Sequence, residues 1–222
     1  MNFLDGEVWG IDASKCTGFA GGLPGGPPRL ECALFSDENV EEPIDKAFGR
    51  GTAWIATKLL HPPIAAFVEA PIPPTQLVRI EGGEIKGRTT FDVGAALMGF
   101  FAIFIGALKC KGVPVVERVS IRAWRSTFLH DPDLKGEQAK RRCVQYCDLL
   151  DWQLPQIWEP PNTYPERMHG RAVAYRFQQN AAEAAGIRTW GIKWMIEQGL
   201  LEHRAMPELH KTDPLFKRVA PQ

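Results

Sequence analysis

The 222-residue sequence lacks several features that would place it in a specialised class of protein. No basic stretch leads into an apolar one at the N-terminus, so no secretory signal is predicted. The apolar run from Val93 to Leu108 is shorter than the ~20 residues that span a bilayer, and it is interpreted as a buried core helix. The formal net charge is +0, so the total charge argues neither for nor against a nucleic-acid partner.

Cysteine is scarce and scattered. The five cysteines are odd in number, and Cys143 and Cys147 have no histidine near them in the sequence. This is not the spacing of a zinc knuckle, so core packing in a reducing cytoplasm is expected. Hydrophobic residues make up 45% of the chain and charged residues 23%. The sequence therefore predicts one globular domain over residues 1–200 and a loosely structured tail over 201–222.

The order of the predicted elements indicates an α/β fold. Apolar runs and their Gly and Pro breakers predict strands at 6–12, 17–22, 29–35, 64–70 and 113–116. Helices are predicted at 43–60, 90–111, 119–129, 135–150 and 169–199. Two segments, 71–90 and 151–168, are predicted to be irregular. This order favours a mixed five-stranded sheet flanked by helices.

Two acidic residues stand at the ends of apolar strands. Asp12 ends the first predicted strand, and Glu69 is the last polar residue of the buried run from Ile64 to Ala70. A carboxylate at the end of a buried strand costs free energy unless a cation or hydrogen-bond donors meet it. If the two strands are parallel neighbours, both carboxylates lie at the same edge of the sheet. A turn aspartate that bonds its own backbone, and a capping or salt-bridged glutamate, are the alternatives.

A third acidic residue lies in the last predicted helix. Asn180 and Glu183 are three residues apart and share one helix face, and the alanines around them would let that face approach the sheet closely. A solvent-facing position for this face is the alternative. Clustered carboxylates repel one another, and their natural use is to hold hard cations such as Mg²⁺ or Mn²⁺. Two such ions about 4 Å apart can activate a water and stabilise the leaving oxygen in phosphodiester cleavage.

These motifs resemble the RuvC-type Holliday-junction resolvases of the RNase H-like superfamily, especially their phage and prophage branch. The resemblance rests on Gly10-Ile11-Asp12 with Thr17-Gly18, on Phe67-Val68-Glu69, and on Asn180-Ala181-Ala182-Glu183-Ala184. It implies an RNase H-like fold, with Asp12, Glu69 and Glu183 as metal ligands and Asn180 as a fourth catalytic position. It also implies two Mg²⁺ or Mn²⁺ ions per site, in a homodimer that cuts four-way DNA junctions in a bacterial or phage-infected cell. Asn180 and Glu183 depart from the acid-Ala-Ala-acid pattern of the family, which often has an acid or a histidine and then an aspartate at these positions.

Basic residues near the predicted site are candidate DNA contacts. Between Lys109 and Arg142, nine Lys or Arg residues stand against four Asp or Glu residues. Such a patch would neutralise phosphates, and a solvated helix face is the ordinary alternative. The residues predicted to contact DNA are Lys15, Arg79, Arg88, Arg122, Arg125, Lys135, Lys140, Arg141 and Arg142. The apolar helix from Phe91 to Leu108 is predicted to pair with its copy in a dimer.

Two other functions fit parts of the sequence. Actin-like ATPases and sugar kinases also begin with a strand, an aspartate and a Thr-Gly hairpin. They need a second similar half with its own Gly-rich phosphate loop, which this sequence lacks. The neutral Asn180 supports a different alternative, in which a nuclease fold has become a DNA-binding or structural module.

Overall fold

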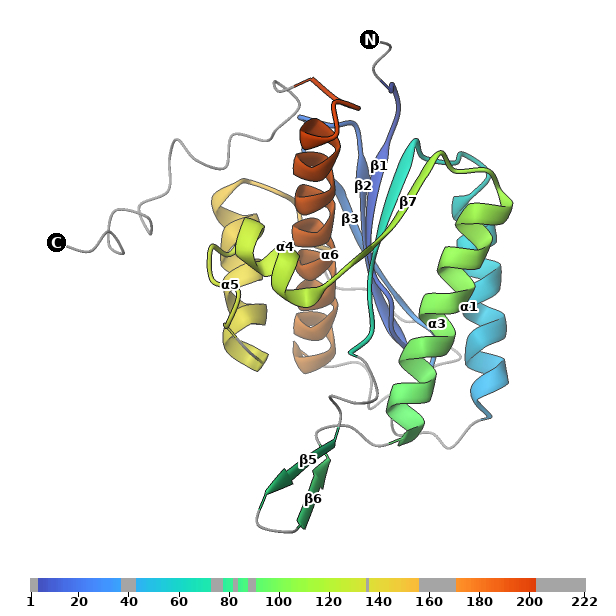
Figure 1. Cartoon of the computed structure of the whole chain (residues 1–222), viewed down its shortest axis with the longest axis vertical. Helices are drawn as coiled ribbons and strands as arrows, with labels where there is room; N and C mark the ends of the chain where they lie inside the picture. The colour runs from blue at the N-terminus through green and yellow to red at the C-terminus, as the bar shows by residue number, and fades with distance from the viewer. Residues whose placement is uncertain are drawn as a thin grey trace, which may run out of the picture.

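The computed structural model describes residues 4–36, 43–72, 78–81, 84–87, 91–134, 136–155 and 171–202. Its centre is a mixed five-stranded sheet with helices on both faces (Figure 1). The sheet contains β1 (Val8–Asp12), β2 (Cys16–Gly22), β3 (Arg29–Leu34), β4 (Ala65–Glu69) and β7 (Val115–Val119) in the order β3-β2-β1-β4-β7. The first three strands are antiparallel neighbours, whereas β4 runs parallel to both β1 and β7. The predicted fold class is confirmed.

The helices form a separate layer on each face of the sheet. On one face lie α1 (Ile44–Lys58) and α3 (Phe91–Cys110) (Figure 1). On the other face α6 (Arg171–Glu197) packs on the sheet, with α4 (Ile121–Phe128) and α5 (Gly136–Leu149) packed against it. A hydrophobic core lies on each face of the sheet, and the central strand β4 contributes side chains to both. Phe67 packs on the α6 side and Val68 on the opposite side. Burial on both faces explains why the run that predicted this strand is apolar throughout.

Two predicted segments differ from the structure. The segment 71–90, predicted to be irregular, contains a hairpin of β5 (Val78–Glu81) and β6 (Glu84–Gly87). These strands are only four residues long, too short for their alternating pattern to stand out among the surrounding Gly and Pro. The last strand lies at Val115–Val119 instead of 113–116, because its pairing with β4 continues as far as Glu69. The predicted irregular segment beyond residue 155 and the tail beyond 202 lie outside the described residues.

The apolar helix α3 is a core helix. By length and composition, Val93–Cys110 could cross a membrane, but one side of it packs on the sheet and on α1. The buried side consists of Ala96, Phe100, Phe104 and Leu108. The spacing of three or four residues along this side is that of an amphipathic core helix. The opposite side exposes a stripe of small or flexible apolar residues, namely Ala95, Met98, Ala102 and Gly106.

Helix α6 lies in backbone contact with β1 and β2. A Cβ atom built on Gly18 would stand 1.9 Å from the carbonyl oxygen of Asn180, and one on Gly10 would stand 2.3 Å from that of Ala184. The helix meets these glycines with a face of buried alanines, namely Ala181, Ala182, Ala184 and Ala185. So close an approach of two backbones requires glycine in the strands. It brings the helix that carries Glu183 directly over the strand that carries Asp12.

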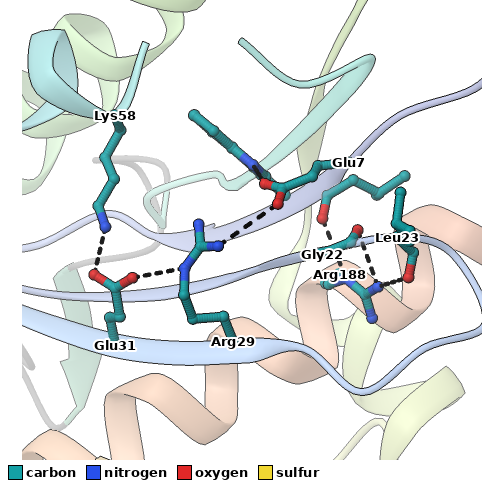
Figure 2. Close-up of polar contacts among 9 residues, drawn as sticks. Glu7, Gly22, Leu23, Arg29, Glu31, Lys58 and Arg188 are labelled. Atoms are coloured by element: carbon teal, nitrogen blue, oxygen red, sulfur yellow. Dashed lines mark hydrogen bonds and ion pairs between the residues drawn. The ribbon is translucent and has the colours of Figure 1, made fainter. Parts of the chain in front are cut away.

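A buried arginine fixes α6 to the far end of the same strands. The Nε atom of Arg188 donates to the carbonyl oxygen of Val8 at 3.1 Å, and its Nη2 donates to those of Gly22 and Leu23 at 3.2 and 2.6 Å (Figure 2). Burial lowers the pKa of Arg188 to about 10, so the guanidinium stays charged at neutral pH. These bonds set the position of α6 along the sheet.

A second polar network ties α1 to the edge of the sheet near Arg188. Glu31 on β3 pairs with Lys58 of α1 and accepts a hydrogen bond from Arg29 at 2.9 Å (Figure 2). Arg29 also lies 3.6 Å from the carboxylate of Glu7, just before β1. The polar links at this end of the strands are structural, whereas Asp12 and Glu69 lie at the opposite end.

Candidate active site

The sheet topology brings the predicted acidic residues together. Strands β1 and β4 are parallel with Ile11 opposite Val68, so Asp12 and Glu69 follow at the same edge of the sheet. Both side chains are half-buried there. Glu183, which α6 places over these strands, is only 6% exposed. The structure thus gathers three carboxylates from β1, β4 and α6.

Burial raises the pKa of all three carboxyl groups, and repulsion within the cluster adds to it for Asp12 and Glu69. Burial is the larger cause in each case, and it brings the pKa of Glu69 to about 7. The charges of Glu69 and Glu183 add to burial in raising the pKa of Asp12, and that of Glu183 adds to it for Glu69. Such repulsion leaves the site in need of positive charge.

Helix α4 holds two of these carboxylates with neighbouring side chains. The indole Nε1 of Trp124 donates to Oε2 of Glu69 at 2.6 Å, and Nη2 of Arg125 lies 3.6 Å from Oε1 of Glu183. The helix starts at this edge because β7 ends there and Ser120 caps it, accepting a backbone hydrogen bond with its hydroxyl oxygen. Sequence reasoning missed both contacts. A buried tryptophan needs a partner for its N–H, which is the signal that could have indicated Trp124.

The prediction that Arg125 contacts DNA does not match its position. Its side chain is 9% exposed, its Nη1 donates to the carbonyl oxygen of Leu134 at 2.7 Å, and its guanidinium carbon lies 5.2 Å from the ring centroid of Trp124. By contrast, the side chain of Arg122 on the same helix is 71% exposed and pairs with Asp133. A count of basic residues along the sequence cannot separate a buried cation from an exposed one.

Helix α5 brings a second cation to the site. The positive charge of Lys140 opposes the rise in pKa of Asp12, Glu69 and Glu183, so its ammonium group acts on all three carboxylates. The helix is fixed against α6 by a hydrogen bond from Nε2 of Gln179 to Glu137 at 3.1 Å. Lys140 therefore lies near enough to the carboxylates to stabilise their charged forms.

The other predicted DNA contacts differ in how exposed they are, and some lie outside the described residues. Lys15 lies in the turn after Asp12, half-buried like Arg142, while Arg141 is exposed on α5. The positions of Arg88 and Lys135 and the side chain of Arg79 lie outside the described residues. Among the predicted DNA contacts that the structure describes, the basic side chains with exposed surface come from the β1–β2 turn, α4 and α5. They are Lys15, Arg122, Lys140, Arg141 and Arg142.

Asn180 is bound to the sheet through its amide. Its Nδ2 donates to the carbonyl oxygen of Cys16 at 2.6 Å, in a buried contact between α6 and β2. An ionised aspartate or glutamate has no donor for this bond. The contact explains why a neutral side chain occupies this position. It also leaves only the amide oxygen of Asn180 for any ligand.

The candidate ligands are of the chemical type that a hard divalent cation prefers, although they do not form a preassembled metal site. Among the described residues, no three His, Cys, Asp or Glu side chains converge as a metal-binding group. Asp12, Glu69 and Glu183 nevertheless supply the oxygen donors that Mg²⁺ and Mn²⁺ prefer, and their mutual repulsion would be relieved by a cation. Trp124 engages one oxygen of Glu69, and Arg125 pairs with one oxygen of Glu183.

The raised pKa of Glu69 predicts a stability change with pH. Its pKa rises from 4.5 to about 7, so between these values the folded state holds a proton that the unfolded state has released. Without divalent metal, the contribution of Glu69 to the free energy of unfolding is then fully present below pH 4.5, and about 3 kcal/mol of it is lost as the pH rises through 7. Urea unfolding in EDTA from pH 5 to 8 measures this slope. Glu69→Gln should reduce the slope, and a slope unchanged by this substitution would contradict the assignment.

The fold matches that of RuvC from Thermus thermophilus. A RuvC structure in complex with a Holliday junction substrate aligns with a TM-score of 0.52 and 15% identity, covering 87% of this chain and 96% of that one. This chain has the RuvC fold. A second T. thermophilus RuvC structure aligns with a TM-score of 0.51 and 16% identity, over 87% and 97% of the two chains. In sequence, the chain matches no protein-family model and no curated protein. The RuvC fold accounts for the RNase H-like strand order observed here.

Proposed function

We propose that this chain is a metal-dependent endonuclease that cuts branched DNA and resolves four-way junctions as a homodimer. The observation that carries the proposal is the meeting of Asp12, Glu69 and Glu183 at one edge of a RuvC-fold sheet. One of the RuvC structures with this fold is a complex with a Holliday junction. Junction resolution needs two matched cuts, which two sites related by a two-fold axis supply.

The chemistry follows from the charges around the site. Mg²⁺ or Mn²⁺, when bound, would activate a water and stabilise the leaving oxygen of the phosphodiester. Asp12, Glu69 and Glu183 are the side chains that would hold it. Trp124 fixes the orientation of Glu69 through its indole hydrogen bond. Lys140, whose charge already acts on the carboxylates, would neutralise the incoming phosphate.

Basic side chains around this edge would hold the DNA backbone. Lys15, Arg122, Arg141 and Arg142 come from three different elements, and each has exposed surface. Arg79, Arg88 and Lys135 are proposed as further contacts. Phosphate contacts of this kind read no base sequence and weaken as salt is added. The proposed recognition is therefore of the shape of the DNA.

The homodimer is proposed to form through the exposed stripe of α3. Ala102→Arg, at the middle of this stripe, should weaken dimerisation about a hundredfold or more, because it buries a charge against its own copy. Light scattering coupled to gel filtration measures the change. The matched control is Ala53→Arg on the exposed side of α1, which should remain dimeric. A dimeric Ala102→Arg variant would exclude this interface.

The proposed function is tested with a synthetic four-way junction in Mg²⁺ and in Mn²⁺ separately. We expect paired symmetric nicks that disappear in Glu69→Gln and persist in Glu117→Gln, which changes an exposed glutamate on β7. Cutting of any branched DNA without symmetry would retain the nuclease and exclude junction resolution. If the junction is not cut in either metal, whether or not it is bound, the proposed endonuclease activity is contradicted.

A second candidate function is junction binding without cleavage. It is favoured by Asn180, which is tied to Cys16, and by Glu183, which is paired with Arg125. Both contacts engage positions that the endonuclease would use. The same junction assay separates the two functions, because tight binding without nicks in either metal supports the binding module.

A further inference from the structure

Arg125 is an unusual residue for the interior of this protein. Its side chain and that of Glu183 are only 9% and 8% exposed, and the two charges face each other. Among the described residues, the buried Nε of Arg125 has no hydrogen-bond partner. A buried ion pair is weak support for a fold, and apolar residues of similar volume often serve as well or better. The position of Arg125 against the carboxylates calls for another explanation.

The guanidinium is held in place by more than Glu183. Nη1 of Arg125 donates to the carbonyl oxygen of Leu134, and the ring of Trp124 lies under the guanidinium. Trp124 is in turn bonded to Glu69. Arg125 is therefore a fixed positive charge built into the carboxylate cluster, with its position set by α4 and by the segment that follows.

A fixed charge at this point limits how many metal ions the site can hold. Three ionised carboxylates carry three negative charges. Arg125 offsets one of them, and the ammonium group of Lys140 acts on all three from α5. A single divalent ion is therefore sufficient to offset the negative charge that remains. A second divalent ion at Glu183 would lie close to the guanidinium in a poorly screened interior, where like charges repel strongly. Asn180, whose amide donates to Cys16, adds no negative charge to attract it.

We infer that Arg125 takes the place of a second metal ion, so that the site binds one divalent cation between Asp12 and Glu69 while Glu183 stays paired with Arg125. This inference rests on the proposed metal-dependent function. It departs from what the sequence resemblance implied in the number of ions, which is one instead of two, and in that Glu183 pairs with Arg125 and does not hold the cation. Arg125 is in this sense a positioning residue. It holds Glu183 and sets the number of ions without contacting the DNA.

The number of bound Mn²⁺ ions per chain tests the inference in protein without DNA. Equilibrium dialysis gives the number, and electron paramagnetic resonance separates an isolated ion from a magnetically coupled pair. We expect one isolated ion in the wild type and in Arg125→Lys, and two coupled ions in Arg125→Met. Arg122→Met, which removes the exposed arginine of the same helix, should bind one ion. Glu183→Gln should keep this ion and Glu69→Gln should lose it.

The outcomes separate the inference from the proposed function. Two ions of similar affinity in the wild type would overturn the inference, whether or not the Arg125 variants fold. So would a single ion in Arg125→Met and in Arg125→Gln, with circular dichroism showing that either variant is folded. A two-ion wild type that cuts junctions would overturn only the inference. A wild type that neither binds Mn²⁺ nor cuts DNA would overturn the proposed function, and this inference with it.

Discussion

Asp12→Asn is expected to abolish junction cleavage while leaving junction binding intact. Asparagine keeps the shape of the side chain at the end of β1 but removes the charge that would hold the cation. Charge stabilisation by a metal ion is worth several kcal/mol, so the cleavage rate should fall about a thousandfold or more. Binding should persist, because the basic residues that would contact phosphate lie on other elements. Cleavage of labelled junctions and a gel-shift titration measure the two effects separately.

The same substitution should stabilise the metal-free protein. Burial and the charges of Glu69 and Glu183 raise the pKa of Asp12, so its carboxylate is unfavourable in the folded state without a cation. Asparagine removes that cost, and Tm in EDTA should rise. Asp133→Asn is the matched control, because that aspartate is exposed and pairs with Arg122 on the surface. Cleavage retained by Asp12→Asn would rule out Asp12 as a ligand, and a folded variant that no longer binds junctions would refute the separation of binding from cutting.

The sequence predicted the fold and the placement of three acidic residues, because local patterns mark the two strands and the helix that carry them. Asp12 and Glu69 follow apolar runs, and the parallel pairing of β1 with β4 carries both to one edge. Glu183 lies on a helix face of alanines, and the close contact of that face with Gly10 and Gly18 needs those small residues. Here the sequence pattern and the packing have the same physical cause.

The surroundings of the carboxylates could not be predicted in the same way. Trp124 and Arg125 reach Glu69 and Glu183 across 55 and 58 positions of sequence, and no local pattern encodes such a contact. Arg125 sits in a stretch with a surplus of basic residues, where charge counting favoured a surface role. The bond from Asn180 to Cys16 likewise spans 164 positions. These long-range partners decide the electrostatics of the site, and only the three-dimensional packing reveals them.

Gly18→Ala is expected to destabilise the protein by about 3 kcal/mol or more, as overpacking against rigid backbone does. Gly18 pairs with Asp12 across the β1–β2 hairpin. A Cβ atom there would stand 1.9 Å from the carbonyl oxygen of Asn180 and 2.4 Å from its carbonyl carbon. Since both are backbone atoms, α6 itself must move away from the sheet. That movement would break the bond from Asn180 to Cys16 and carry Glu183 away from Asp12.

The matched control for this prediction is Gly49→Ala in α1. A Cβ atom on Gly49 would have no neighbour within 4 Å, so this substitution should stabilise the protein by about 1 kcal/mol through helix propensity alone. The two variants make the same chemical change and should shift the urea midpoint in opposite directions. An unchanged or raised urea midpoint in Gly18→Ala would mean that α6 can move away from the sheet without loss of stability. The close contact would then not be what holds Glu183 over Asp12.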